Sequence, residues 1–151
     1  MNRIGNARSW RDLMDDLTIG QIVDLEASEK RRAETPAQLL RLARDWIAHN
    51  LIQMECADIP VPADALDTPL DWEQSGSGYR RGYTVWERSG ERPGAEELLF
   101  VVQVQGRQYS DGRITRQIVA LAELEGIDAV EARRIGAALM EGADALDALD
   151  G

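Results

Sequence analysis

The sequence predicts an α+β protein, in which N-terminal helices precede a small antiparallel sheet of three or four strands and a C-terminal helix packs on that sheet. Two observations predict this class. Residues 9–57 and 128–149 repeat apolar side chains at helical spacing. Between them, residues 79–121 are rich in β-branched and aromatic residues and alternate in polarity, as strands do. The chain has 151 residues, a usual length for one domain, so we expect residues 1–151 to form a single domain.

Helix start signals divide residues 9–57 into two or three helices. Each start has a Ser or Thr followed three positions later by an acid or an amide, a pattern that caps the first turn. These pairs are Ser9 with Asp12, Thr18 with Gln21, and Thr35 with Gln38. Pro36 takes the first helical position of the last segment, where its missing N–H costs nothing. One stripe of this segment is expected to be buried: Leu39, Ala43, Trp46, Ile47, Asn50, Leu51 and Met54.

Residues 58–78 interrupt the helical pattern and are predicted to connect the helices to the sheet. Three prolines, Pro60, Pro62 and Pro69, remove backbone donors and favour an extended chain. The Ser-Gly-Ser-Gly run at residues 75–78 is typical of a turn. A short strand is expected around Trp72.

The first two strands of the sheet are predicted at residues 79–87 and 98–105. A turn over residues 89–94, which include Gly90, Pro93 and Gly94, separates them. Alternation along the second strand predicts one buried face, formed by Leu98, Phe100, Val102 and Val104, and places Leu99 and Gln103 on the other face.

The Asp111-Gly112 pair predicts a hairpin that leads into a third strand over residues 113–121. The expected turn is of type I′, which requires a positive φ at both central residues. Gly106 is expected to add a bulge or a second turn. One face of the third strand carries Ile114, Ile118 and Ala120.

The last predicted helix covers residues 129–149. Asp128 and Glu131 put acidic groups at its N-terminal end, which the helix dipole favours. We expect this helix to cover one face of the sheet, with the N-terminal helices packed beside it. Its apolar stripe consists of Ile135, Leu139, Ala143, Leu146 and Leu149.

The hairpin and the last helix carry a resemblance to known proteins. The stretch from Val102 to Ile114, followed by an Ala-rich helix from Glu131 to Leu146, resembles a strand pair and helix in small uncharacterised proteins of high-GC actinobacteria and their phages. The resemblance covers about the last third of the chain, and more loosely residues 16–22. It implies an actinobacterial or phage accessory protein, and it carries over no activity and no catalytic residues.

The charge and the apolar runs argue against several function classes. The formal net charge is −10, of which residues 121–151 contribute −6, with two basic against eight acidic side chains. A negative field repels nucleic acid phosphates and anionic membranes. The longest strongly apolar run, residues 98–102, is far shorter than the ~20 residues of a membrane helix, and no secretory signal is visible. We therefore expect a cytoplasmic protein without a membrane partner.

The residues that most often do chemistry do not form a recognisable site. His49 is the only histidine, Asp45 precedes it by four positions and Cys56 follows it by seven. Along one helix, seven residues span about 10.5 Å, whereas a nucleophile and its base need roughly 3 Å. A zinc site usually takes three or four ligands, and no phosphate-binding glycine loop is present. We predict no catalytic residue, no metal and no cofactor.

Arginine and aromatic residues are interleaved in the predicted sheet. The simplest interpretation is cross-strand pairing of the arginines with acids on a solvated face. These residue types also dominate protein-binding surfaces, and on an open sheet they stack bases and hold phosphates. Protein binding ranks above nucleic acid binding because the chain is acidic. The candidate binding residues are Arg81, Tyr83, Arg107, Tyr109, Asp111, Arg113 and Arg116.

The sequence thus favours a non-catalytic accessory or adaptor protein that binds another protein through this sheet or through the acidic last helix. A small-molecule or nucleotide-binding domain, including an enzyme, is the alternative, and a nucleic-acid-binding regulator is the third hypothesis. A homo-oligomer remains open. For the alternative, we expect a pocket between sheet and helices near Trp72, Trp86, Tyr109 and Asp111.

Overall fold

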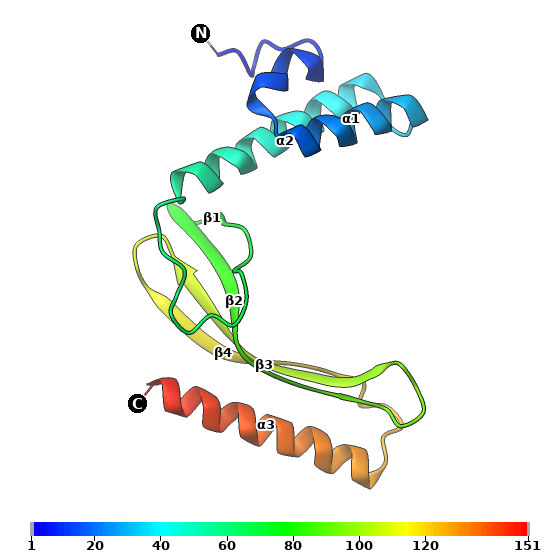
Figure 1. Ribbon diagram of the computed structural model, residues 1–151, viewed down its shortest axis with the longest axis vertical. Coiled ribbons are helices and arrows are strands. Elements are labelled where there is room, and N and C mark those ends of the chain that lie inside the picture. Colours follow the sequence, from blue (N-terminus) through cyan, green and yellow to red (C-terminus); the bar gives the residue numbers. More distant parts are fainter. Residues whose placement is uncertain (1, 151) are drawn as a thin grey trace. The chain divides into compact units, whose positions relative to one another are not determined.

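A computed structural model describes residues 2–150 and confirms the α+β class, with helices, a four-stranded antiparallel sheet and a C-terminal helix on that sheet (Figure 1). The chain divides into two compact units, Met1–Asp58, which is helical, and Ile59–Gly151, which contains the sheet and the last helix. We call them the helical unit and the sheet unit. The expectation of one domain, with the N-terminal helices beside the last helix, stays a prediction.

The helical unit contains a 3₁₀ helix and two α-helices: η1 (Trp10–Asp16), α1 (Ile19–Arg31) and α2 (Pro36–Glu55). The predicted caps of α1 and α2 are confirmed. The Thr18 hydroxyl accepts from the N–H of Gln21, and the Thr35 hydroxyl from the N–H of Gln38, both at 3.2 Å. Each Gln side chain accepts in return from the backbone N–H of its Thr. At the start of η1, the carboxylate of Asp12 accepts two backbone N–H groups.

The core of the helical unit forms where η1, α1 and α2 meet. Its buried side chains are Trp10, Leu13, Leu25, Leu39, Ala43 and Ile47. The predicted stripe on α2 is buried as far as Ile47, but Leu51 and Met54 are exposed, so the prediction is wrong for these two. The other elements of the helical unit do not cover α2 beyond this point. Leu51 and Met54 instead line an open hollow together with Leu17 and Thr18.

The sheet unit contains one antiparallel sheet whose strand order follows the sequence: β1 (Glu73–Ser75), β2 (Gly78–Glu91), β3 (Leu98–Tyr109) and β4 (Ile114–Ala122). The short strand expected around Trp72 is β1, which begins one residue after it. β2 continues to Glu91, because residues 89–91 still pair with β3. The turn predicted at residues 89–94 is therefore wrong for residues 89–91, which belong to β2. Pro93 and Gly94 do lie in a turn, in which the Ala95 N–H donates to the Arg92 carbonyl at 3.1 Å.

The buried side chains of β3 follow simple alternation except at the start of the strand. As predicted, Phe100, Val102 and Val104 are buried. Leu98 is 54% exposed and Leu99 only 2%, so the prediction is wrong for both. Gly90 lies opposite Phe100 and Glu91 opposite Leu98, a register shift that leaves Leu99 without an opposite residue on β2. Such an irregularity re-aims side chains locally, and Leu99 joins the core of the sheet unit.

The connection between β3 and β4 is a three-residue turn and not the predicted type I′ turn. The Tyr109 N–H donates to the Arg113 carbonyl at 2.9 Å, and the Gly112 N–H donates to the Tyr109 carbonyl at 3.0 Å. Gly112 has a φ of 97°, whereas the φ of Asp111 is not positive. This arrangement is a type I turn closed by a glycine. The bulge or turn predicted at Gly106 is also wrong, since Gly106 pairs in register with both neighbouring strands.

The last helix, α3 (Ala129–Asp150), packs on one face of the sheet, as predicted. Its buried residues are Ile135, Ala138 and Gly142. Leu139 is 39% exposed, which makes the predicted stripe wrong at that position. The reason is a close approach at Gly142: Trp86 and Val102 each come within 3.2 Å of the place that a Cβ would occupy there. This contact turns the side of the helix that carries Gly142 toward the sheet.

Two glycines of α3 provide a matched test of this packing. Gly136→Ala is expected to raise the free energy of unfolding of the sheet unit by about 0.5–1 kcal/mol, because Ala favours a helix over Gly. No atom lies within 4 Å of the added methyl group. Gly142→Ala should lose this gain, because its methyl group presses on Trp86 and Val102. Urea unfolding of both variants measures the difference, and equal gains would contradict the close approach.

Candidate functional site

The two faces of the sheet differ in what covers them. Trp86 and Val102 point to the face on which α3 lies, and we call it the inner face. Residues 59–64 reach the same face, where the Gln108 side chain donates to the Pro60 carbonyl at 2.9 Å. The opposite, outer face carries no helix of the described sheet unit (Figure 1).

Two predicted binding residues, Arg81 and Arg116, point to the inner face and hold the connector there. The Arg81 guanidinium lies 4.6 Å from the centre of the Trp72 ring, and its Nε donates to the Gln108 side chain at 2.8 Å. Arg116 pairs with Asp64 at 2.8 Å, and only 23% and 21% of these two side chains are exposed. Such cation–π and charge-assisted contacts are directional. Both arginines therefore position residues 59–72 on the sheet.

Tyr83, a third predicted binding residue, is 4% exposed and lies flat against Gly106, where any Cβ would overlap its ring. Burial raises the pKa of the Tyr83 hydroxyl, because the charged form loses its solvation. The negative charge of Asp64 raises this pKa further, and the positive charge of Arg116 lowers it. Tyr83 is thus a core residue of the sheet unit whose hydroxyl favours its neutral form.

The raised pKa of Tyr83 predicts a pH dependence. The unfolded chain loses this proton near pH ~10, whereas the folded chain keeps it to higher pH. The stability that Tyr83 contributes is therefore fully present below pH ~10 and is lost as the pH rises toward the folded pKa. In a titration of tyrosinate absorbance, Tyr83→Phe should lose a deprotonation step that the wild type shows above pH ~10. An unchanged titration above pH ~10 would contradict the assignment.

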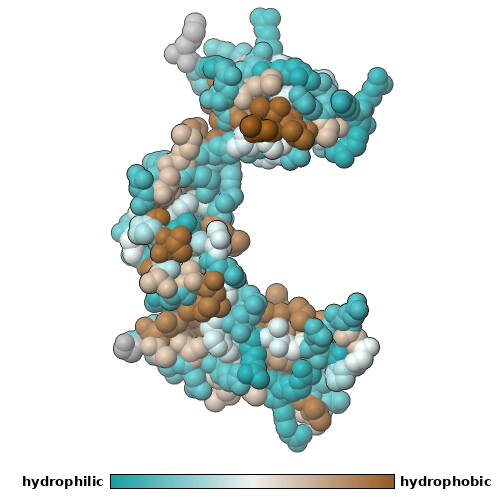
Figure 2. All heavy atoms as spheres, in the orientation of Figure 1, coloured by the Kyte–Doolittle hydropathy of each residue, from teal (hydrophilic) through white to brown (hydrophobic). Residues whose placement is uncertain are grey.

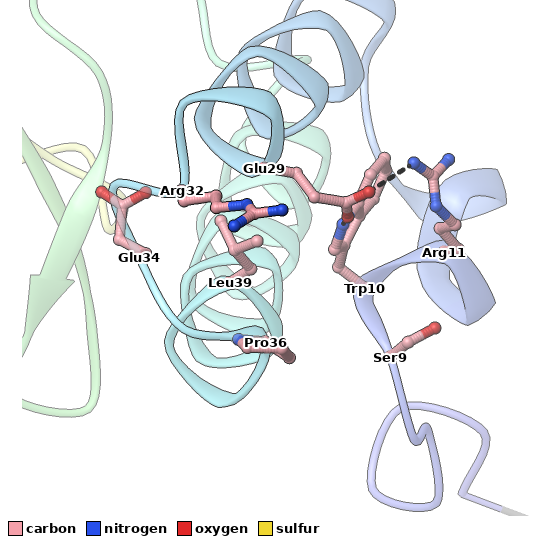
Figure 3. A pocket seen from close by; sticks show the side chains of 8 residues that line it. All are labelled: Ser9, Trp10, Arg11, Glu29, Arg32, Glu34, Pro36 and Leu39. Atoms are coloured by element: carbon pink, nitrogen blue, oxygen red, sulfur yellow. Dashed lines mark hydrogen bonds and ion pairs between the residues drawn. The ribbon is translucent and has the colours of Figure 1, made fainter.

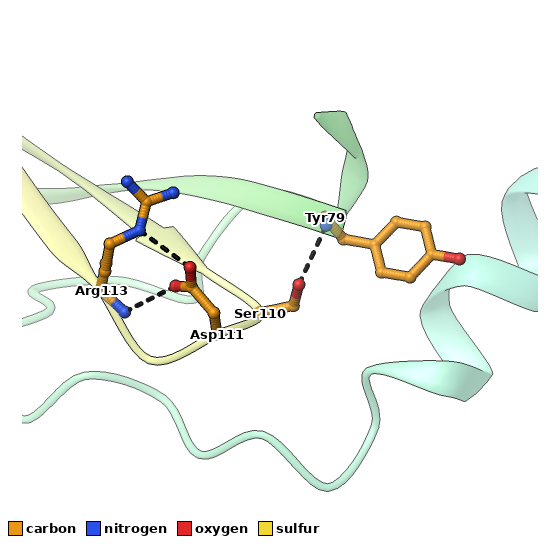
Figure 4. A network of polar contacts seen from close by, with 4 residues as sticks. All are labelled: Tyr79, Ser110, Asp111 and Arg113. Atoms are coloured by element: carbon orange, nitrogen blue, oxygen red, sulfur yellow. Dashed lines mark hydrogen bonds and ion pairs between the residues drawn. The ribbon is translucent and has the colours of Figure 1, made fainter. Parts of the chain in front are cut away.

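The other four predicted residues gather at the hairpin end of the sheet, and we call them the hairpin cluster: Arg107, Tyr109, Asp111 and Arg113. The Arg113 guanidinium stacks 4.5 Å from the centre of the Tyr109 ring. Its Nε donates to the Asp111 carboxylate at 2.9 Å (Figure 4). The backbone N–H of Arg113 also donates to this carboxylate and is the main cause of the lowered pKa of Asp111.

Arg107 differs from the other arginines at this end of the outer face. Arg80 pairs with Glu73 at 2.8 Å, and Arg113 pairs with Asp111 at 2.9 Å. Arg107 is exposed and forms no ion pair within residues 2–150. Because an exposed ion pair costs little to break, all three guanidinium groups remain accessible to a partner, but only Arg107 carries an uncompensated charge.

The outer face changes from amides to apolar residues with distance from the hairpin cluster. The Gln105 side chain donates to Gln103, which in turn donates to Glu87, each at 2.7 Å. Farther along the same face are Val101, Val119 and Leu121. Leu121 is 70% exposed. Arginine, tyrosine, amide and aliphatic side chains therefore follow one another on a single surface that no helix of the sheet unit covers within residues 59–150.

The residues expected around a small-molecule pocket lie in different places. Trp72 is buried beneath Arg81, and Trp86 packs against α3. The hollows beside Gly82 on the outer face have volumes of only ≈ 180 and ≈ 200 Å³. Pockets for drug-sized ligands usually have about 300–1,000 Å³. The sheet unit thus offers a contact surface and not a deep site at these positions.

A hollow of ≈ 360 Å³ lies in the helical unit, where the sequence indicated none (Figure 3). Three of its polar side chains are paired with one another, whereas the buried Oε2 of Glu34 has no hydrogen-bond partner among the described residues. The Trp10 Nε1 and the Arg11 guanidinium both donate to the Glu29 carboxylate, at 2.7 and 2.9 Å. These bonds, chiefly that of Arg11, lower the pKa of Glu29. No motif marks this hollow in the sequence, because its walls come from η1, α1, α2 and the loop with Arg32 and Glu34.

The helical unit also exposes apolar side chains at the start of α1. Figure 2 shows hydrophobic residues gathered over these first turns, where Ile19 and Val23 are exposed. Only Leu25 of α1 is fully buried. A patch of this kind is a smaller candidate contact surface.

Within residues 2–150, no three His, Cys, Asp or Glu side chains are grouped so that they could hold a metal ion. No helix of that range has the length and apolar character needed to cross a membrane. No family model, curated protein or solved structure matches the chain. Fold and surface define its class as an α+β protein with a four-stranded sheet that its C-terminal helix covers on one face.

Proposed function

We propose that the protein is a non-catalytic accessory or adaptor protein that binds another protein through the outer face of the sheet. The observation that carries the proposal is the sequence of side chains on this face, from Arg107 and the stacked Arg113 and Tyr109 to the exposed Leu121. Arginine and tyrosine are enriched among the residues that dominate protein interfaces. We expect the protein to act in the cytoplasm, as an accessory protein of an actinobacterium or a phage.

The charges of this face favour a protein over a nucleic acid as the partner. Affinity for nucleic acid depends on several cations that neutralise phosphates. Arg80 and Arg113 already have carboxylate partners, and the chain carries a net charge of −10. A protein partner needs only one carboxylate opposite Arg107 and an apolar side chain opposite Leu121.

Affinity capture from a nuclease-treated lysate, with the tagged full-length chain, tests the proposal. Arg107→Glu is the test variant, because this exposed residue makes no ion pair with any other residue of the described range that its loss would break. Arg133→Glu is the matched control: it makes the same change of charge at an exposed position of α3. We expect a stoichiometric protein partner for the wild type and the control, and at least about tenfold weaker capture for Arg107→Glu.

Two outcomes would contradict the proposal. Equal capture of the partner by both variants would show that the contact does not lie on the outer face. Recovery of nucleic acid, with binding that falls steeply as salt is added, would replace the protein partner by a nucleic acid.

A further inference from the structure

The two edges of the sheet are not equivalent. On the β2 side, β1 pairs with residues 78–80. Beyond β1, the N–H groups of Leu70 and Leu66 donate to the carbonyls of Gly82 and Thr84 at 2.9 and 2.8 Å. The chain itself therefore covers this edge along residues 78–84 of β2. On the other side, β4 pairs with β3 alone in the described sheet, so this edge is free along its whole length.

The hydrogen-bond pattern identifies which groups of β4 are free. Residues that exchange hydrogen bonds with the neighbouring strand alternate with residues that point away from it. The bond from the Tyr109 N–H to the Arg113 carbonyl sets this alternation, and Arg107 lies opposite Thr115 in the same register. Residues 115, 117, 119 and 121 therefore bond to β3. Residues 114, 116, 118, 120 and 122 direct their N–H and C=O groups outward.

β4 lacks most of the features that normally prevent a free edge from pairing. Its nine residues contain no proline and no lysine, and its pairing with β3 has no register shift. Proteins usually protect long edge strands with such residues or with bulges. The one charged side chain, Arg116, is directed to the inner face and paired with Asp64.

We propose that β4 pairs with β4 of a second copy of this chain, antiparallel about a two-fold axis, so that the two sheets become one. A two-fold axis at Ile118 places it opposite Ile118 of the second copy. Because a two-fold axis relates the two copies, the contact uses the same patch on each of them and closes a dimer, without further growth.

The register about Ile118 is compatible in charge and shape. It places Arg116 opposite Ala120 of the second copy, and Gln117 opposite Val119 of the second copy. The two Arg116 residues lie about 14 Å apart along the strands, at ~3.4 Å per residue, which exceeds the Debye length of about 8 Å in physiological salt. No two charges of like sign are directly opposite. The contact also joins the outer faces of both copies, including Leu121, into one surface.

The proposal goes beyond the proposed function, because it concerns a second copy and a surface distinct from the hairpin cluster. Its test is the mass of the purified full-length chain in sedimentation velocity over a range of concentrations. We expect a reversible equilibrium between the monomer and a species of twice its mass. A chain that stays monomeric at all concentrations would overturn the proposal, and so would continued growth beyond the dimer.

Two double variants test the register. In the proposed dimer, residue 117 of each copy lies opposite residue 119 of the other, so this pair occurs twice. Gln117→Lys with Val119→Lys places like charges opposite each other, and should weaken the dimer at least about tenfold. Gln117→Lys with Val119→Glu places opposite charges there, and should keep or strengthen it. Equal dimer constants for the two variants would overturn the proposed pairing.

Amide hydrogen exchange of the wild type gives a measurement that depends on no variant. The N–H groups of Arg116, Ile118 and Ala120 should exchange more slowly as concentration rises, because they gain partners in the second copy. Those of Gln117 and Val119 bond to β3 in the monomer and should change much less. Protection that rises equally at all five positions, or at none, would contradict an edge-to-edge contact.

Discussion

Leu99→Ala is expected to lower the free energy of unfolding of the sheet unit by about 2–5 kcal/mol, whereas Leu98→Ala should lower it by less than about 1 kcal/mol. The two neighbouring leucines have the same chemistry but opposite environments. Leu99 packs in a buried cluster with Phe100, Val102 and Ile135. Leu98 is mainly exposed. Removing the buried side chain loses its transfer free energy and leaves a cavity, which removal of the exposed one does not.

Urea unfolding followed by amide hydrogen exchange of β3 measures both variants in the unit that contains them. Each leucine serves as the control for the other. The opposite ranking would mean that β3 keeps simple alternation to its first residue, and that the register shift between Gly90 and Glu91 is absent.

Gly106→Ala is expected to destabilise the sheet unit by about 3 kcal/mol, the upper part of the range for overpacking a core. Tyr83 lies directly opposite Gly106, and its ring occupies the space of the missing side chain. A methyl group there would overlap the ring. Tyr83 is nearly fully buried, so the ring has no free path by which to move aside.

A double-mutant cycle separates this clash from the general cost of changing a glycine in a strand. Tyr83→Ala alone should cost about 3–5 kcal/mol, as for other large aromatic truncations. In the Tyr83→Ala variant, adding Gly106→Ala should lower the free energy of unfolding only slightly. The coupling free energy between the two positions should therefore exceed about 1 kcal/mol. Additive effects in the cycle would show that the ring does not rest on Gly106.

In the helical unit, short-range sequence patterns predict the helix caps but not where the buried stripe of α2 ends. The Thr18 and Thr35 caps form as predicted, because each needs only a side chain and a backbone N–H three positions away. The end of the buried stripe on α2 was not predictable in the same way. Leu51 and Met54 continue the helical spacing, but how far the rest of the helical unit covers α2 depends on tertiary packing.

For the candidate binding residues too, the sequence indicates one property, the face of the sheet, but not another, the packing partner. Alternation puts Arg81 and Arg116 on one face and Arg107 on the other. The sequence did not reveal which face residues 59–64 cover, and so did not reveal which arginines would be used in packing. Arg116 and its partner Asp64 are 52 positions apart, a separation at which no local pattern signals a contact.

By itself, the sequence determined the α+β class, the helix starts, the position of the β3–β4 hairpin and the alternation of the central strand from Phe100 onward. These features depend on residues within a few positions of one another. Tertiary structure alone decided that Leu99 is inside and Leu98 outside and, within residues 2–150, that Arg107 has no ion pair and that β4 is a free edge. The physical reason is that burial and pairing are set by which distant segments share a surface, and these contacts join residues that no short-range periodicity connects.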